Sequence, residues 1–351
     1  MLALVQRSRS FPALSVVAVL ALALVPTAFP FHDDGTAHCG ACHVTHGEKP
    51  DVGDALLKAG NATDTCLRCH DSRHGNTWGP GDDPLAPGDL YGGGQFVFLL
   101  EDNLNDAPGG AGEPIAGHAA GHSIISRDKG TAADPIHAVA PGGTYPASAM
   151  HCTSCHDPHG RGGHFRLLYG NDHPESRAGG HVFSYTYPAP DAEGIPVHGP
   201  AESDSRHTAY RSGMSDWCAN CHGRYHDDSS PGGAFEHPVD ELLSPRIVER
   251  YNSYDGTGQP PASEPYLALV PFEDPAVGVG YTGTASSGSS RITCLTCHRA
   301  HASSAPHSGR WDFNVESWAA EGVESGSYPI PNPYPAAGSS QEDLCHKCHE
   351  N

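Results

Sequence analysis

One short unit, CxxCH, occurs six times in this chain and uses every cysteine that the chain has. The cysteine pairs are Cys39 and Cys42, Cys66 and Cys69, Cys152 and Cys155, Cys218 and Cys221, Cys294 and Cys297, and Cys345 and Cys348. A histidine directly follows the second cysteine of every pair. Because no cysteine is left over, one chemistry must account for all twelve.

CxxCH is the attachment sequence of haem c, in which two thiols bond the porphyrin and the adjacent histidine binds the iron. Zinc knuckles and disulfide frameworks also use paired cysteines, but neither needs a histidine after every second cysteine. Histidine accounts for 25 of 351 residues, so six such coincidences do not arise by chance. We therefore predict six covalently attached haem c groups. The predicted proximal iron ligands are His43, His70, His156, His222, His298 and His349.

The first thirty residues have the pattern of a secretory signal peptide. Arg7 and Arg9 precede an apolar run over residues 11–25, and small residues with prolines follow. A retained membrane anchor is the alternative, although this run is short for a bilayer span. We predict a signal peptide over 1–30, secretion via the periplasm, and no membrane span in the mature form.

The net charge of the full chain is −21. Such a surface argues against nucleic acid or anionic lipid as a partner, and it favours positively charged proteins, including redox partners, or metal cations. The same charge also serves solubility alone, so both interpretations stay open.

The composition predicts a chain that is mostly coil, with short helices and few short strands. It contains 42 glycines and 31 prolines and is only 37% hydrophobic, so we expect a chain of stacked haems to form the core. We predict a short helix at each CxxCH, a short strand within 92–102, and loops over 79–89 and 282–291.

The six units form three pairs, which predicts three modules of two haems each over 31–115, 116–235 and 236–351. The first unit of each pair has a further histidine three residues after the proximal one. These histidines are His46, His159 and His301. Another histidine precedes each pair, and these are His32, His122 and His237.

These six histidines are the predicted distal iron ligands. The mature chain retains only Met150 and Met214, so methionine cannot supply most sixth ligands, and we expect bis-histidine irons of low potential. On a helical turn, a spacing of three places both imidazoles on nearly the same side, so His46, His159 and His301 must serve a different haem from that of their own unit. His74 and His226 compete with His32, His122 and His237, and the remaining histidines are assigned to propionates or solvent.

Four segments resemble the doubled-CxxCH multihaem cytochromes, and most of all the hexahaem cytochromes that form extracellular filaments. They are FHDDGTAHCGACHVTHG, GGGQFVFLLED with GHSII, HCTSCHDPHGRGGHFRLL and CLTCHRAHASSAPHSGRWDF. The resemblance covers nearly all of residues 31–351, with six motifs in the same order. It implies subunits that polymerise head to tail with a continuous haem chain, a mature N-terminus at Phe31, and ligation by His46 of a haem in the adjacent subunit.

We predict an extracellular electron-conducting filament and no catalysis, because an enzyme needs an iron with an open site and all six units here are regular. A monomeric periplasmic electron carrier and a nitrite- or hydroxylamine-type reductase are the alternatives. If each +3 histidine serves the first haem of the preceding module, His159 pairs with His43 and His301 with His156. The haem of His298 is then left without a distal ligand, and His46 is left without a haem, so the two join neighbouring subunits. The alternative is that His32, His74 or His307 caps the haem of His298 within its own subunit.

Overall fold

The computed structural model describes residues 32, 39–44, 56–71, 77–78, 91–100, 116–195, 202–226, 237–256, 264–313, 333–334 and 342–349. The predicted signal peptide, the predicted loop over 79–89, His46 and His74 lie outside the described residues.

The described residues are mostly coil, as predicted. A helix carries each of the first five cysteine pairs, whereas the sixth helix holds Cys345 and ends before Cys348. These helices are α2 (Cys39–Cys42), α3 (Ala62–His70), α4 (Cys152–Cys155), α5 (Met214–His226), α7 (Cys294–Cys297) and α9 (Glu342–His346). Another helix, α6 (Pro245–Ser253), begins at Ser244, whose hydroxyl accepts a hydrogen bond from the Ile247 amide at 3.3 Å. Residues 282–291 form no helix or strand, which agrees with the predicted loop.

Two small antiparallel sheets are present among the described residues. Strands β1 (Glu175–Ala178) and β2 (His181–Ser184) pair with Glu175 opposite Ser184, and strands β3 (Asp191–Glu193) and β4 (Ala209–Ser212) pair with Glu193 opposite Ala209. Short 3₁₀ turns complete the regular structure. They are η3 (Phe96–Leu100), η5 (Gly117–Ala119), η6 (Ala147–Ala149), η7 (Phe165–Leu167) and η8 (Pro306–Ser308).

The strand predicted within 92–102 is wrong, because this segment forms η3 instead. Residues 96–99 are all buried, so the segment lacks the alternation of exposed and buried positions that a two-faced strand requires. Gly94 turns the chain into it with φ +72°, and a Cβ atom there would lie 2.0 Å from the Ala302 carbonyl oxygen. Only glycine permits this backbone approach.

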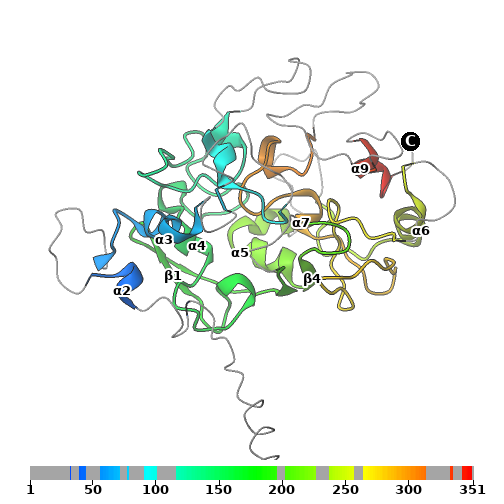
Figure 1. The fold of residues 1–351 in the computed structure, drawn as a ribbon, viewed down its shortest axis with the longest axis horizontal. Coiled ribbons are helices and arrows are strands. Elements are labelled where there is room, and N and C mark those ends of the chain that lie inside the picture. The colour runs from blue at the N-terminus through cyan, green and yellow to red at the C-terminus, as the bar shows by residue number, and fades with distance from the viewer. Residues whose placement is uncertain are drawn as a thin grey trace, which may run out of the picture.

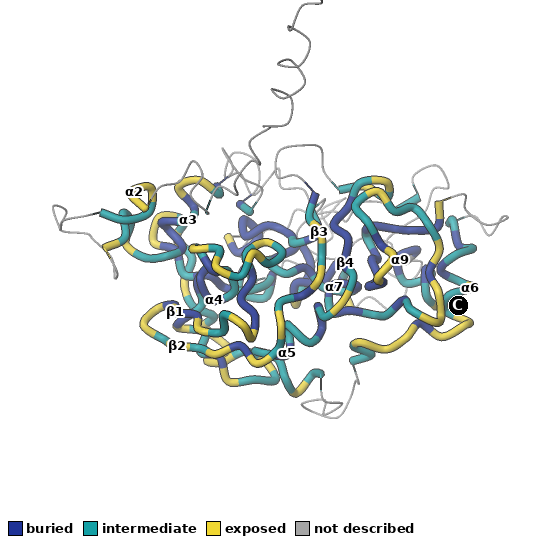
Figure 2. The backbone as a smooth tube through the Cα atoms, turned by 90° about the horizontal axis from the view of Figure 1, so that it is seen from below, coloured by how far each residue is buried: buried dark blue, intermediate teal, exposed yellow. Residues whose placement is uncertain are grey.

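The motif-bearing helices follow one another in sequence order along the long axis of the molecule, from α2 at one end to α9 near the other (Figure 1). Figure 2 shows buried backbone through the middle of the body, whereas α2 is largely exposed. The motifs therefore form one row rather than a cluster. None of the helices in the described part of the chain has the length and apolar character of a membrane span.

The polypeptide forms apolar clusters of its own beside the motifs. One cluster contains Tyr251, Tyr266, Phe272 and Leu344, and another contains Trp78 with residues 96–99. The second cluster explains why the aromatic segment of η3 is buried on all sides.

Segments from all three predicted modules meet in one place, which we call the three-segment ladder (residues 93–95, 120–122 and 301–303). The His301 amide donates to the Gly93 carbonyl at 2.7 Å, and the His122 amide donates to the His301 carbonyl at 2.9 Å. The Ser303 amide donates to the Ala120 carbonyl at 3.0 Å. The backbone thus joins the predicted modules through hydrogen bonds made beside His122 and His301.

Candidate haem-binding sites

The proximal histidines of the first, third and fifth motifs share one backbone frame. In each case the helix ends at the second cysteine, and the histidine forms an isolated antiparallel bridge with a residue further along the chain. The bridges are His43 with Leu57, His156 with Leu168, and His298 with Gly309. We call the returning segment of each bridge a strap.

Two backbone hydrogen bonds close every strap in the same positions. In the third motif, the Asp157 amide donates to the Leu167 carbonyl at 2.7 Å, and the Tyr169 amide donates to the Cys155 carbonyl at 3.0 Å. The residue before each bridge partner has a left-handed backbone, and these residues are Leu56, Leu167 and Ser308. None of them is glycine, so the sequence contained no signal for this turn.

The straps orient the proximal imidazoles. His156 Nδ1 donates to the Arg166 carbonyl at 2.7 Å, and His298 Nδ1 donates to the His307 carbonyl at 2.9 Å. With the proton on Nδ1, the lone pair resides on Nε2, the nitrogen that is then available to iron. His307 therefore contributes to the fifth motif through its backbone carbonyl.

The fourth motif also orients its proximal histidine by a backbone carbonyl, but its backbone has no strap. Helix α5 continues past Cys221, with a kink at His222 (φ −119°, ψ 37°). His222 Nδ1 donates to the Pro141 carbonyl at 2.7 Å, which lies 81 residues away in sequence. Gly143 permits this contact, because a Cβ atom there would lie 1.7 Å from the Cys221 carbonyl oxygen. The Pro-Gly-Gly sequence at 141–143 was the signal for this loop, but it did not reveal the partner.

Four pairs of the predicted ligands face each other across gaps of similar width. The ring centres are 6.3 Å apart for His43 and His159, 6.0 Å for His32 and His70, 6.4 Å for His156 and His301, and 5.9 Å for His122 and His222. A metal bound at about 2 Å by each of two opposed imidazole nitrogens separates the ring centres by about 6 Å. Each pair joins one proximal histidine to a histidine from outside its own motif.

The protonation of these rings suits metal binding. Burial lowers the pKa of His222 to about 4 and that of His301 to about 3, so both rings are neutral at pH 7. Burial also lowers the pKa of His122 and His156. The Ala300 carbonyl accepts a hydrogen bond from His122 Nδ1 at 2.7 Å, and the Gly94 carbonyl accepts one from His301 Nδ1 at 3.3 Å. Neutral imidazole with a free Nε2 lone pair is the form that binds iron.

The prediction that the +3 histidines lie on a helical turn with the proximal histidines is wrong. His156 and His298 have extended backbones, so each helix ends before the histidine and the offset of three residues does not lie on a helical turn. The strap, not a helix, directs His159 towards His43 and His301 towards His156.

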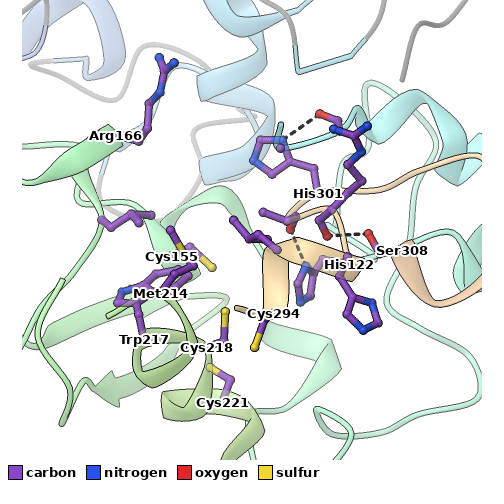
Figure 3. A pocket seen from close by; sticks show the side chains of 18 of the residues that line it. His122, Cys155, Arg166, Met214, Trp217, Cys218, Cys221, Cys294, His301 and Ser308 are labelled. Atoms are coloured by element: carbon purple, nitrogen blue, oxygen red, sulfur yellow. Dashed lines mark hydrogen bonds between the residues drawn. The ribbon is translucent and has the colours of Figure 1, made fainter. Parts of the chain in front are cut away.

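Cysteines of successive motifs lie against one another. Cys66 lies next to Cys152, and Cys218 lies next to Cys294. Figure 3 shows the sulfurs of Cys218, Cys221 and Cys294 gathered in one pocket. Burial raises the pKa of Cys155 to about 11, which marks an apolar thiol rather than a reactive thiolate. Among the described residues, no cluster of three or more cysteine, histidine or acidic side chains could hold a metal ion.

One cavity of about 2940 Å³ passes all six motifs. It is several times larger than an ordinary small-molecule site of roughly 300–1,000 Å³. All six proximal histidines line it, and so do His32, His122, His159, His237 and His301.

Two proximal histidines have no opposed imidazole among the described residues. His298 has a ring contact with Phe313 at 5.2 Å, and His349 is exposed. His237 packs edge-on against Tyr225, with the ring centres 4.8 Å apart. Burial lowers the pKa of His298, and the charges of the nearby His237 and His307 lower it further. The structure therefore does not bring His237 into ring contact with His349, and it does not describe His46.

Histidines outside the predicted ligand set have other partners. His226 bonds Asp216 at 2.8 Å, and His151 bonds the Thr63 hydroxyl at 3.0 Å. The carbonyls of Pro141, Arg166 and His307 were missed by sequence reasoning, because a backbone oxygen leaves no trace in residue type.

Thiol pairs with an adjacent oriented histidine, opposed imidazoles and a shared apolar cavity define a multihaem c-type cytochrome. No protein-family model matches the chain. The chain is 30% identical to C-type cytochrome OmcS of Geobacter sulfurreducens, over 96% of this chain and 98% of that protein. It belongs to the family of this cytochrome and carries covalently bound haem c.

Solved structures give the same result for the fold. The chain is similar to the outer membrane cytochrome S filament from Geobacter sulfurreducens, with a TM-score of 0.69, 24% identity, and coverage of 91% of this chain and 99% of that chain. It is also similar to the OmcS nanowires from Geobacter sulfurreducens, with a TM-score of 0.68, 26% identity and the same coverage.

Proposed function

We propose that this chain is a secreted subunit that polymerises into an extracellular filament and conducts electrons along a continuous row of six bis-histidine haems. Its partners are further copies of itself, redox proteins that deliver electrons, and acceptors outside the cell. It acts as a conductor and not as an enzyme. The relatives that are described as a filament and as nanowires support the assembly.

The observation that carries this proposal is the set of four opposed imidazole pairs in a row of six motifs. The distances of 5.9–6.4 Å between their ring centres fit a haem iron bound by one imidazole on each face of the porphyrin. Haem supplies one-electron chemistry between ferric and ferrous iron. The row lies along an apolar cavity, and no described pair is open for a substrate. Backbone carbonyls hold the imidazoles of His32, His122, His156, His222, His298 and His301.

The proposed ligands follow from these pairs and from the repeat. The six haems are attached at the six cysteine pairs, with the following histidine as proximal ligand. The distal ligands are His159 for the haem of His43, His32 for that of His70, His301 for that of His156, His122 for that of His222, and His237 for that of His349. The haem of His298 takes His46 of the neighbouring subunit.

The junction follows from the unmatched ends of this series. Within this six-motif series, His46 is the one +3 histidine without a haem to serve, and the haem of His298 is the one first-of-pair haem without a +3 histidine. A contact of this head-to-tail kind satisfies both ends and propagates as a filament, because it does not close on itself. The exposed position of α2 at one end of the row agrees with this arrangement.

Electron microscopy of the secreted holoprotein tests the proposal. We expect filaments from the wild type and from the control His173→Ala, whose residue does not line the cavity. His46→Ala should give soluble subunits that retain six haems by mass. Unchanged filaments from His46→Ala, or a wild type that never polymerises, would overturn the junction.

A monomeric carrier is the second candidate, and the position of His237 and His307 near His298 favours it. In that case either residue caps the haem of His298 within one subunit. His237→Ala and His307→Ala then change the spectrum of that haem, whereas His46→Ala changes nothing.

A further inference from the structure

The sixth motif carries a buried lysine that the proposed function does not use. Lys347 stands between Cys345 and Cys348, and only 1% of its surface is exposed. Lysine is almost never fully buried without a partner, because removing an ammonium from water is costly. A charge kept in this place needs an explanation.

The lysine is fixed by the end of helix α6. Its Nζ donates to the Tyr251 carbonyl at 2.7 Å and to the Tyr254 carbonyl at 3.0 Å, and it lies 4.6 Å from the centre of the Tyr251 ring. These carbonyls belong to the last turn and the C-cap of α6, where the helix dipole favours a cation. The ammonium therefore has one position and not several.

The charge is not neutralised by a close carboxylate. Among the described residues, Lys347 forms no ion pair, and Asp204 and Asp255 act on it only from farther away. A second cation adds to it, because Arg250 Nε donates to the His346 carbonyl at 2.8 Å. Lys347 lies behind the motif, not on the cavity wall. In this weakly polar interior its field reaches the cavity with little screening.

We propose that Lys347 is a fixed positive charge that raises the reduction potential of the haem attached at Cys345 and Cys348. Reduction adds a negative charge to that haem, and a buried ammonium stabilises the added charge. The last haem of each subunit then holds an electron more readily than it would beside a neutral side chain. This inference rests on the proposed function, because it requires a haem at the sixth motif.

A spectroelectrochemical titration of the holoprotein tests the proposal. Lys347→Met removes the charge, Lys347→Gln removes it but keeps a donor for the carbonyls, and Lys347→Arg keeps it. Arg246→Met is the matched control, because it removes a cation from an exposed position of the same helix, α6. Haem content by mass and circular dichroism are recorded for every variant before titration.

We expect one sixth of the absorbance change to move to lower potential in Lys347→Met and Lys347→Gln, and to stay in place in Lys347→Arg and Arg246→Met. An unmoved titration in a six-haem Lys347→Gln protein would overturn the inference, and so would an equal shift of all six components. A wild type with fewer than six haems would instead contradict the proposed function. Retention of the shift in Lys347→Gln separates the effect of charge from loss of the tether to α6.

Discussion

The third motif, which with its strap spans residues 152–169, and helix α5 carry the same CxxCH unit in two different backbone frames. In the strap, the helix stops at Cys155 and a local turn supplies the carbonyl for His156 Nδ1 at 2.7 Å. In α5, the helix runs on through His222, and the carbonyl comes from Pro141 in another part of the chain. In both frames Nδ1 carries the proton, Nε2 keeps its lone pair, and the histidine lines the cavity.

This difference shows where the information for each site resides. The strap is closed by hydrogen bonds within eighteen residues, and the next histidine, His159, extends from it to the preceding haem site. Helix α5 depends on distant partners at both ends, since Glu273 accepts the Gly213 and Met214 amides at its start. Strap motifs are local units, and the α5 motif is a product of tertiary structure.

The largest effect should follow from preventing haem attachment. A cavity of about 2940 Å³ cannot stay open without its contents, and fixing the backbone costs roughly 1–2 kcal/mol per residue. We expect both frames to be lost, and circular dichroism of the haem-free chain to show disorder. A cooperatively folded apoprotein would mean that the apolar clusters around Tyr251 and Trp78 suffice.

Removing one distal histidine from each frame should separate them. His159→Ala should convert one iron of six to high spin and leave the others unchanged, because its imidazole extends from an exposed loop. His122→Ala should convert one iron and also alter a second low-spin signal, because His122 bonds the Ala300 carbonyl beside His301. Electron paramagnetic resonance measures both. Identical spectra for the two variants would show that the strap motif and the α5 motif do not differ in this way.

A smaller effect is expected at Glu273, which caps α5. Burial raises the pKa of this carboxyl, because desolvation outweighs the two amide bonds that it accepts. When a carboxyl has a higher pKa in the folded state than in the unfolded state, the protein loses stability as the pH rises above the unfolded-state pKa of about 4.3. Glu273→Gln should therefore melt slightly higher than wild type at pH 7 and equally at about pH 3.5. A lower melting temperature at pH 7 would show that the charge stabilises the helix.

The smallest effect concerns the left-handed residue of the first strap. Leu56 has φ 57° and is 48% exposed, so glycine relieves strain there with little loss of burial. Leu56→Gly should stabilise the holoprotein by about 0.5–1 kcal/mol. The control Leu57→Gly, at the bridge itself, should destabilise it. Thermal unfolding, followed by haem absorbance, compares the stabilities of the two variants. Equal losses of stability would show that the backbone of Leu56 is not strained.

The sequence predicted the motifs, the largely irregular fold and the histidines that now face His43, His70, His156 and His222. It did so because residue type and spacing carry that information. It could not predict the straps, since Leu56, Arg166 and His307 adopt left-handed backbones without glycine. It also missed η3, where burial on all sides removed the periodic pattern, and the carbonyl of Pro141, which only tertiary contact brings to His222.

Electron paramagnetic resonance of the oxidised wild-type filament, with spin quantification, measures directly whether every iron has two imidazole ligands. We expect six low-spin ferric haems per chain, including the haem of His298 at the subunit junction, and no high-spin signal. A stoichiometric high-spin ferric signal in the assembled protein would contradict this expectation and would indicate an iron with an open coordination site.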